Sequence, residues 1–194
     1  MAITAVAPKP VFADLAGRSR LKDAAAIGLG AAWVAALGQV SIPLGFTPVP
    51  LSLGTFAVLT AGTVLGARRA ALSMVLFLAA GLAGAPVFAG GAHGLGVPTL
   101  GYLVGYVAGA GLAGWAASRG ADRKVAPSLG VMAAASATVY VLGVPYLAWV
   151  ADLSVRQALM AGLVPFLVGD AIKVVAASAL FPAAWKLVGH LLER

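Results

Sequence analysis

Four long stretches with almost no charge constrain the fold of this chain more than any other feature. Residues 24–67 and 125–151 are uncharged over 44 and 27 positions, and residues 70–118 contain only His93 as a group that titrates near neutrality. The fourth stretch, 157–185, is interrupted by Asp170 and Lys173 alone. A helix needs about 20 residues to cross the hydrocarbon core of a bilayer. The first and second stretches in chain order, 24–67 and 70–118, therefore hold two crossings each and the others one each. This pattern predicts an all-α integral membrane protein with six transmembrane helices.

Composition excludes several other classes of protein. Hydrophobic residues make up 61% of the 194 positions and charged residues 10%, where a soluble domain carries about 25% charged residues. A soluble enzyme, a nucleic-acid-binding protein and a disordered chain are poor interpretations of these values. The absence of cysteine excludes disulfides and thiol catalysis. His93 and His190 cannot form a metal site without carboxylates, so we expect neither a metal nor a cofactor.

Proline and glycine mark the breaks inside the two longest stretches. Residues 43–50 contain Pro43, Pro48 and Pro50, and residues 84–98 combine prolines with several glycines. Proline lacks an N–H and pushes the preceding residue toward extended backbone, so neither segment continues a helix. The expected helices cover residues 23–43, 51–66, 69–84, 99–118, 127–150 and 163–190.

The positive charges predict the orientation in the membrane. Six crossings place both termini on one side, and 11 of the 13 lysines and arginines fall on that side. Lysine and arginine concentrate in cytoplasmic loops, so both termini are expected in the cytoplasm, with the protein in the cell (inner) membrane. We divide the chain into a basic cytoplasmic tail, 1–22, and a single six-helix membrane domain, 23–194. Attraction to anionic lipid headgroups accounts for the net charge of +7 without nucleic acid.

Asp170 and Lys173 are the only formally charged residues inside the expected spans. Their separation of three places them side by side on one helical face. A charge at the centre of a bilayer costs about 2.5–3.5 kcal/mol, so the pair requires an explanation. One interpretation is an ion pair that only fixes helix packing. The other is a polar ligand contact in a cavity, which the position in the outer half of the membrane favours because segments 43–50 and 84–98 lie on the same side.

Small residues spaced by four predict close helix–helix approach. Gly101, Gly105 and Gly109 are expected to pack within the fold. The alanines of the first helix form two such pairs, which we interpret as either internal packing or contact with a partner subunit: Ala31 with Ala35, and Ala32 with Ala36.

Several motifs taken together resemble the BioY family, the biotin-specific S components of energy-coupling factor (ECF) transporters. The resemblance runs in order over residues 24–185. Its pieces are Pro43 with Thr47-Pro48-Val49-Pro50-Leu51, residues 65–73, residues 84–91, Gly101-Tyr102, and Pro165-Phe166-Leu167-Val168-Gly169-Asp170-Ala171-Ile172-Lys173. The chain departs from the family where Val97 and Leu100 replace two glycines.

The resemblance implies a high-affinity biotin binder that is not an enzyme and that takes its ligand from the outer face. The aspartate and lysine matching Asp170 and Lys173 then contact the ureido head of biotin. The apolar bicycle is expected against Phe166, Phe88, Val87 or Tyr102, beneath a lid that includes Thr47, Pro48 and Pro50. The implied partners are a transmembrane T component and two ATPase subunits, with the alanine stripe of the first helix (Ala31, Ala32, Ala35 and Ala36) as the contact.

Other interpretations stay open at this point. The chain could be an S component for a different vitamin, or a stand-alone biotin transporter without ATPase partners. A retinal-type chromophore protein is disfavoured by six helices and by a spacing of three between Asp170 and Lys173. A membrane-embedded enzyme would need a second catalytic group near Asp170, and no other carboxylate falls within the expected spans.

Overall fold

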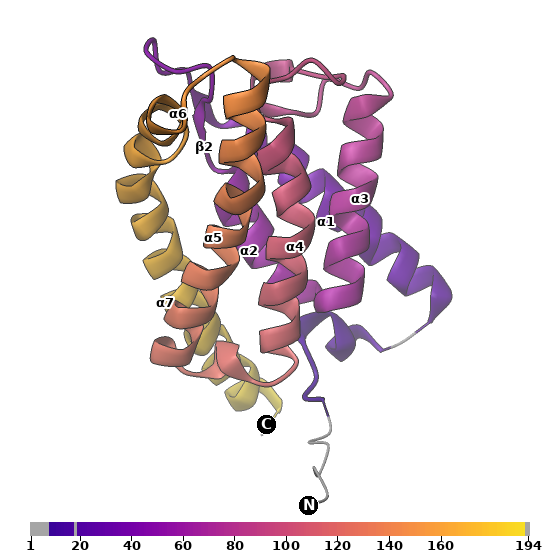
Figure 1. The fold of residues 1–194 in the computed structure, drawn as a ribbon. Helices are drawn as coiled ribbons and strands as arrows, with labels where there is room; N and C mark the ends of the chain where they lie inside the picture. The colour runs from indigo at the N-terminus through magenta and orange to yellow at the C-terminus, as the bar shows by residue number, and fades with distance from the viewer. Residues whose placement is uncertain (1–7, 18, 193–194) are drawn as a thin grey trace, which may run out of the picture.

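The computed structural model describes residues 8–17 and 19–192, and almost all of its regular structure is helical (Figure 1). Six helices of 12 residues or more form the body. A short helix, three-residue and five-residue 3-10 turns, and a two-stranded hairpin connect them. In chain order the main elements are α1 (Arg20–Gln39), β1 (Ser41–Ile42), β2 (Leu51–Ser52), α2 (Gly54–Leu65), α3 (Ala67–Leu82), α4 (Leu100–Ala117), α5 (Val125–Val150), α6 (Val155–Gly162) and α7 (Leu167–Leu192).

The six long helices run roughly alongside one another, with α4 in the middle (Figure 1). Helix α4 packs against α2, α3 and α5, while α1 packs against α2 and α3, and α7 against α5 and α2. The ends of the described chain lie at one end of the bundle, which we name the terminal end. The hairpin, α6 and the α3–α4 connection lie at the opposite end, which we name the loop end.

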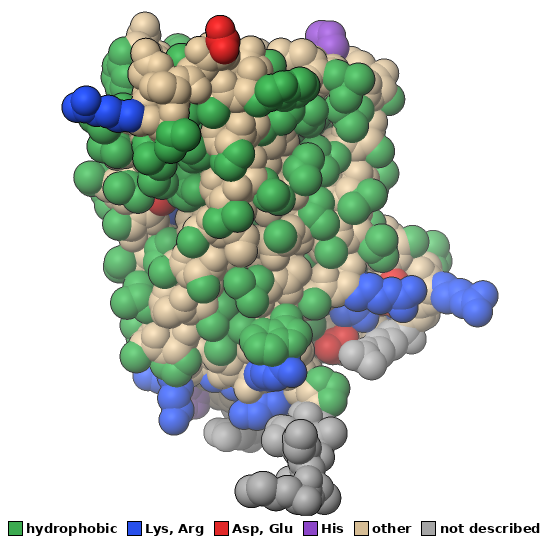
Figure 2. Space-filling model, in the orientation of Figure 1, with side chains coloured by type: hydrophobic (Ala, Val, Ile, Leu, Met, Phe, Trp, Pro, Cys, Tyr) green, Lys and Arg blue, Asp and Glu red, His purple; other side chains and the backbone are tan. Residues whose placement is uncertain are grey.

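The outer surface matches a membrane-spanning protein. Among the described residues, four helical segments are long and apolar enough to cross a bilayer: Arg20–Gln39, Leu100–Ala117, Val125–Val150 and the continuous stretch Val155–His190. Figure 2 shows an apolar side face, with lysine and arginine gathered mainly at the terminal end. This distribution is the one that the charge pattern of the sequence predicts.

Helices α2 and α3 are shorter than a full crossing. With 12 and 16 residues they span about 18 and 24 Å at 1.5 Å per residue, against a hydrocarbon core of about 30 Å. At the loop end of α2 the chain forms the hairpin, in which Ser41 pairs with Ser52 and Ile42 with Leu51. The expected helix boundaries at 43 and 51 are therefore wrong by three or four residues, because the hairpin takes up the backbone hydrogen-bonding groups there.

Close packing of α4 on α5 depends on glycine, as the four-residue spacing predicts. A Cβ added at Gly101 would lie 2.3 Å from the Cβ of Tyr146, and one added at Gly105 would lie 2.7 Å from the Cα of Val139. Neither distance is compatible with a side chain, so the two backbones touch along this seam. The expectation that these glycines pack within the fold is confirmed.

The start of the last membrane segment differs from the expected boundary at 163. Helix α6 already begins at Val155, after Ser154, whose hydroxyl accepts a hydrogen bond from the N–H of Gln157 while the Gln157 side chain returns to the N–H of Ser154. This reciprocal capping box starts a helix. Pro165 then stands in the 3-10 turn Val164–Phe166, which separates α6 from α7.

The segment before α1 packs against the terminal end of the bundle. The N–H of Lys9 donates to the carbonyl of Ser118 at 2.7 Å, and the ring of Phe12 stacks on Trp185 with 4.2 Å between ring centroids. Val11 is buried. The described part of the segment assigned to a tail, 8–17 and 19–22, is thus in contact with the membrane helices.

Candidate functional site

A cavity at the loop end brings together side chains from α2, α4, α5, α7, the hairpin and the α3–α4 connection. Its lining residues are Val49, Pro50, Ser52, Thr55, Ala89, Thr99, Tyr102, Leu103, Tyr106, Val139, Tyr140, Phe166, Asp170 and Lys173. Five of the nine expected ligand-contact residues lie here: Pro50, Tyr102, Phe166, Asp170 and Lys173. Most of the wall is apolar or aromatic, and the two charged residues of the lining, Asp170 and Lys173, both come from α7.

Asp170 is the polar centre of this cavity. It is 7% exposed, and its Oδ1 accepts a hydrogen bond from the Nζ of Lys173 at 2.8 Å. Its Oδ2 accepts a hydrogen bond from the hydroxyl of Tyr140 on α5. The carboxylate is thus held from two sides and by two helices, as a buried charge requires.

Three tyrosines from neighbouring helices form one wall of the cavity. Tyr102 and Tyr140 meet edge to face with 6.1 Å between ring centroids, and the Tyr102 hydroxyl donates to the carbonyl of Gly162 at 2.8 Å. Tyr106 lies one turn further along α4 and is buried. The sequence analysis named Tyr102 but missed Tyr106 and Tyr140. An aromatic residue in an apolar helix can pack in the core or line a cavity, and no local signal in the sequence distinguishes these two roles.

The turn between β1 and β2 closes part of the loop end. The Thr47 hydroxyl donates to the carbonyl of Ala161 on α6 at 2.7 Å and accepts a hydrogen bond from the N–H of Val49 at 3.2 Å. Val49 and Pro50 line the cavity, whereas Thr47 and Pro48 do not. Thr47 therefore attaches the turn to α6 instead of facing the cavity space.

Phe88 and Val87, expected on the cavity wall, lie outside the lining set. The Phe88 ring is fully buried against Phe77, and a Cβ added at Gly81 would lie 2.2 Å from it. Its burial under α3 leaves its neighbour Ala89 to line the cavity. The position of Phe88 in a glycine-rich loop does not predict whether its ring points into the cavity or into the core beneath α3.

Gln39, the last residue of α1, holds this connection in place. Its Nε2 donates to the carbonyls of Val87 and Phe88 at 3.1 and 2.9 Å, and its Oε1 accepts from the N–H of Gly91 at 3.1 Å. Gly90 and Gly91 have φ of 68° and 74°, in the region that glycine tolerates best. The amide side chain of Gln39 thus attaches the α3–α4 connection to α1, a contact that the sequence does not predict.

The cavity is narrow in this structure. The space between its lining atoms is about 540 Å³ with open solvent included, but only about 60 Å³ of it can hold the centre of a water molecule. Pockets for small molecules measure roughly 300–1,000 Å³. A bicyclic ligand therefore requires some lining side chains, or the turn above them, to move.

The alanine pairs of α1 separate into two sets. Ala31 is buried and Ala35 half-buried against the rest of the chain, while Ala32 and Ala36 are exposed. Ala31 is thus occupied by internal packing and unavailable to a partner. Only Ala32 and Ala36 remain as candidates for a partner contact.

The polar groups of the cavity suit an uncharged polar group on the ligand, and in the described residues they do not form a metal site. In the described residues no group of three histidine, aspartate or glutamate side chains lies close enough to hold a metal ion. Asp170 accepts hydrogen bonds, whereas Lys173 donates them and Tyr140 can do either. A ligand with adjacent N–H donors and a carbonyl acceptor satisfies this arrangement, and the apolar wall suits a hydrocarbon ring.

Comparison with known proteins places the chain among membrane transport proteins. The BioY family model matches residues 9–190. The biotin transporter BioY of Rhizobium etli is 37% identical over 182 residues, covering 88% of this chain and 96% of that protein. The biotin transporter BioY of Thermotoga maritima is 36% identical over 156 residues, covering 79% and 89%.

The fold itself also has a solved counterpart. The crystal structure of the S-component for biotin from an ECF-type ABC transporter superposes with a TM-score of 0.76 at 25% identity, covering 86% of this chain and 92% of that one. The family model matches nearly the whole chain, the two relatives are covered over most of their own length, and the fold matches that of an S component. The chain therefore belongs to the BioY family of transporter S components and is a multi-pass membrane protein.

Proposed function

We propose that this chain is the biotin-binding subunit of a vitamin uptake transporter, and that the cavity at the loop end is where it holds biotin. The observation that carries the proposal is the position of Asp170 and Lys173. The two charges pair at 2.8 Å, and both also line a cavity with Tyr140, Tyr102 and Phe166 instead of lying inside a solid core. The chain is a transport component and not an enzyme.

The chemistry of the ureido ring matches these groups. The ring carries two N–H donors and one carbonyl acceptor, so Asp170 accepts from an N–H and Lys173 donates to the carbonyl. Hydrogen bonds to charged partners in a low-dielectric site are short and strong. Tyr140 keeps the second oxygen of Asp170 occupied and thereby orients the carboxylate. The aromatic faces of Tyr102 and Phe166 cover the apolar ring system, and Pro50 closes it from the hairpin.

The charge distribution supports an orientation in the cell (inner) membrane with the terminal end in the cytoplasm. Basic residues collect at that end, as they do on the cytoplasmic side of membrane proteins (Figure 2). The cavity then opens toward the outside, from which biotin arrives.

A transmembrane T component and two ATPase subunits supply the energy for transport in this proposal. The chain has no phosphate-binding loop of its own, since no glycine-rich run in its sequence ends in a lysine followed by serine or threonine. The exposed residues Ala32 and Ala36 on α1 allow close approach of another helix. We assign the T-component contact to this strip.

Equilibrium binding of biotin to purified protein in detergent tests the proposal, with thiamine and riboflavin as competitors. Tight binding of biotin that neither competitor displaces is the expected result. Binding of another vitamin in place of biotin would reject the ligand while leaving the fold intact. Biotin uptake by cells that express this chain without any ATPase partner would instead reject the assignment of the energy source.

A further inference from the structure

A second and larger cavity lies at the terminal end, between the first turns of α1 and α3. Its volume is about 760 Å³. The N-terminal segment forms one wall, and the α2–α3 turn forms its floor. The lining residues are Pro8, Lys9, Val11, Asp14, Arg20, Asp23, Ala24, Ile27, Leu65, Gly66, Ala67, Arg68, Arg69, Leu72 and Ser118. None of them lines the cavity at the loop end.

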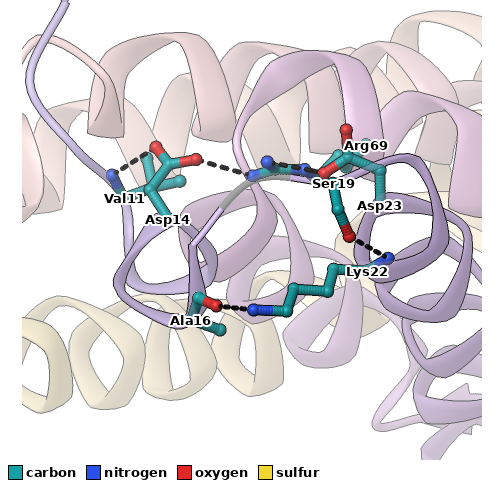
Figure 3. A network of polar contacts seen from close by, with 7 residues as sticks. All are labelled: Val11, Asp14, Ala16, Ser19, Lys22, Asp23 and Arg69. Carbon is teal, nitrogen blue, oxygen red and sulfur yellow. Dashed lines mark hydrogen bonds and ion pairs between the residues drawn. The ribbon is translucent and has the colours of Figure 1, made fainter.

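Arg69, one of the lining residues, is the centre of a network of polar contacts (Figure 3). Its guanidinium donates to Oδ1 of Asp14 at 2.9 Å and to Oδ1 of Asp23 at 2.8 Å, joining the N-terminal segment, α1 and α3. Lys22 adds a hydrogen bond from its Nζ to the carbonyl of Ala16 at 2.5 Å. Both carboxylates on the cavity wall are thus engaged by one arginine.

The remaining charge of the lining is positive. Four cations face two carboxylates across the cavity, a net charge of +2, and Arg69 is the cation that pairs with them. Within residues 8–17 and 19–192, Arg20 and Arg68 form no ion pair. Two guanidinium groups therefore stand at one cavity with no carboxylate of the described chain to neutralise them.

Each of the two helices places an apolar side chain deeper in the same cavity. On α1, Arg20 is followed on its face by Ile27, about 10 Å further along at 1.5 Å per residue. On α3, Arg68 is followed one turn later by Leu72, which is 41% exposed on the apolar side face. Cations and apolar side chains that line one cavity at the terminal end match the two parts of a phospholipid.

We propose that this cavity is a specific site for an anionic phospholipid, with its phosphate against Arg20 and Arg68 and an acyl chain along Ile27 and Leu72. The site is separate from the biotin cavity, so the inference stands or falls independently of the proposed function. It differs from general attraction of basic residues to a charged membrane because it depends on a shaped cavity as well as on charge.

Native mass spectrometry of the detergent-purified protein tests the site, with phosphatidylglycerol and phosphatidylcholine of identical acyl chains as probes. One basic residue near an anionic surface contributes about 1 kcal/mol, roughly fivefold in affinity. The double variant Arg20→Gln/Arg68→Gln is therefore expected to bind phosphatidylglycerol about 25-fold more weakly. The matched control Arg119→Gln/Lys124→Gln removes two exposed cations outside the cavity at the same end and should bind as the parent does.

A third variant distinguishes the contribution of the cavity's shape to lipid binding from the contribution of its charge. Ile27→Trp leaves every charge in place and fills the groove, so it should also reduce phosphatidylglycerol binding, and sn-glycerol 3-phosphate without acyl chains should not compete. Thermal unfolding of each variant verifies that it is folded. The proposal is overturned if phosphatidylcholine binds equally well, if the control pair loses as much as the Arg20/Arg68 pair, or if Ile27→Trp binds like the parent.

Discussion

Tyr140 on α5 donates its hydroxyl hydrogen bond to the carboxylate of Asp170 on α7, across the cavity in which we place biotin. A hydrogen bond to a charged group contributes about 1.5–3 kcal/mol. Tyr140→Phe removes only this hydroxyl, so biotin affinity should fall by about tenfold or more. Isothermal titration calorimetry measures the change. Tyr146→Phe is the matched control, since its hydroxyl contacts the carbonyl of Leu95 outside the cavity, and equal affinity of the two variants would contradict the role of Tyr140.

Asp170 and Lys173 are expected to affect biotin binding at least as strongly as Tyr140. Asp170→Asn replaces an acceptor of two hydrogen bonds by a neutral group, and Lys173→Ala removes the ammonium that pairs with it. Each change should lower biotin affinity by at least about tenfold, because charge-assisted hydrogen bonds are the strong ones. Lys186→Ala, on the same helix but exposed at the terminal end, should leave affinity unchanged. Parent-like biotin binding by both site variants would move the site elsewhere.

Gln39 should affect binding without touching the ligand. Gln39→Ala removes all three hydrogen bonds to the turn that presents Ala89, and Gln39→Glu keeps the acceptor for Gly91 but loses both donors. We expect affinity to fall by a few-fold in Gln39→Ala, since a neutral hydrogen bond contributes about 0.5–1.5 kcal/mol. The loss should be at least as large in Gln39→Glu, because its second carboxylate oxygen faces the two carbonyl oxygens to which Gln39 donates. The readout is the dissociation constant for biotin set beside the unfolding temperature. A loss of thermal stability with unaltered affinity would show that Gln39 serves the fold alone.

Gly105 tests the seam between α4 and α5. Gly105→Ala places a Cβ 2.7 Å from the Cα of Val139, and backbone cannot move away as a side chain can. Overpacking of this kind costs about 1–3 kcal/mol. Gly111→Ala on the same helix meets nothing within 4 Å and should be neutral or stabilising. Unfolding temperatures in detergent compare the two, and a stable Gly105→Ala protein would mean that the seam can open without cost.

Asp122 should make stability depend on pH. Burial raises the pKa of this carboxyl above its usual 3.8, outweighing the hydrogen bond from Trp185 and the charges of Arg123 and Lys9, which lower it. The folded protein then binds more protons than the unfolded one between 3.8 and the raised pKa, so stability falls as pH rises through this window. Asp122→Asn cannot ionise and keeps an oxygen for Trp185. Thermal unfolding at several pH values should show the unfolding temperature of the variant increasing relative to that of the parent as pH rises. Parallel curves of unfolding temperature against pH would exclude the effect.

Several parts of the fold and site follow from the sequence for clear physical reasons. The uncharged stretches predict the six long helices because an apolar segment in a bilayer satisfies all its backbone hydrogen bonds within itself only as a helix. Asp170 and Lys173 stand out since charge is rare in such a segment. The seam of Gly101, Gly105 and Gly109 follows from spacing alone.

Other parts depend on contacts between segments far apart in the chain. Tyr140 and Asp170 are hydrogen-bonded although 30 positions separate them in the sequence, and Gln39 and Phe88 although 49 positions separate them. No local pattern encodes either pair. Helix α6 is different, because Ser154-Val155-Arg156-Gln157 is a capping-box sequence. The start of this helix could therefore be predicted from the local sequence.

The hairpin turn above the cavity has a kinetic consequence. It contains no helix, and in the described chain one side-chain hydrogen bond, from the Thr47 hydroxyl to the Ala161 carbonyl, joins this turn to α6. Segments with few buried contacts open locally at much lower free energy than the whole protein unfolds. In the function we propose, the residence time of biotin is governed by the opening rate of this short segment, and the helical body stays intact during each exchange.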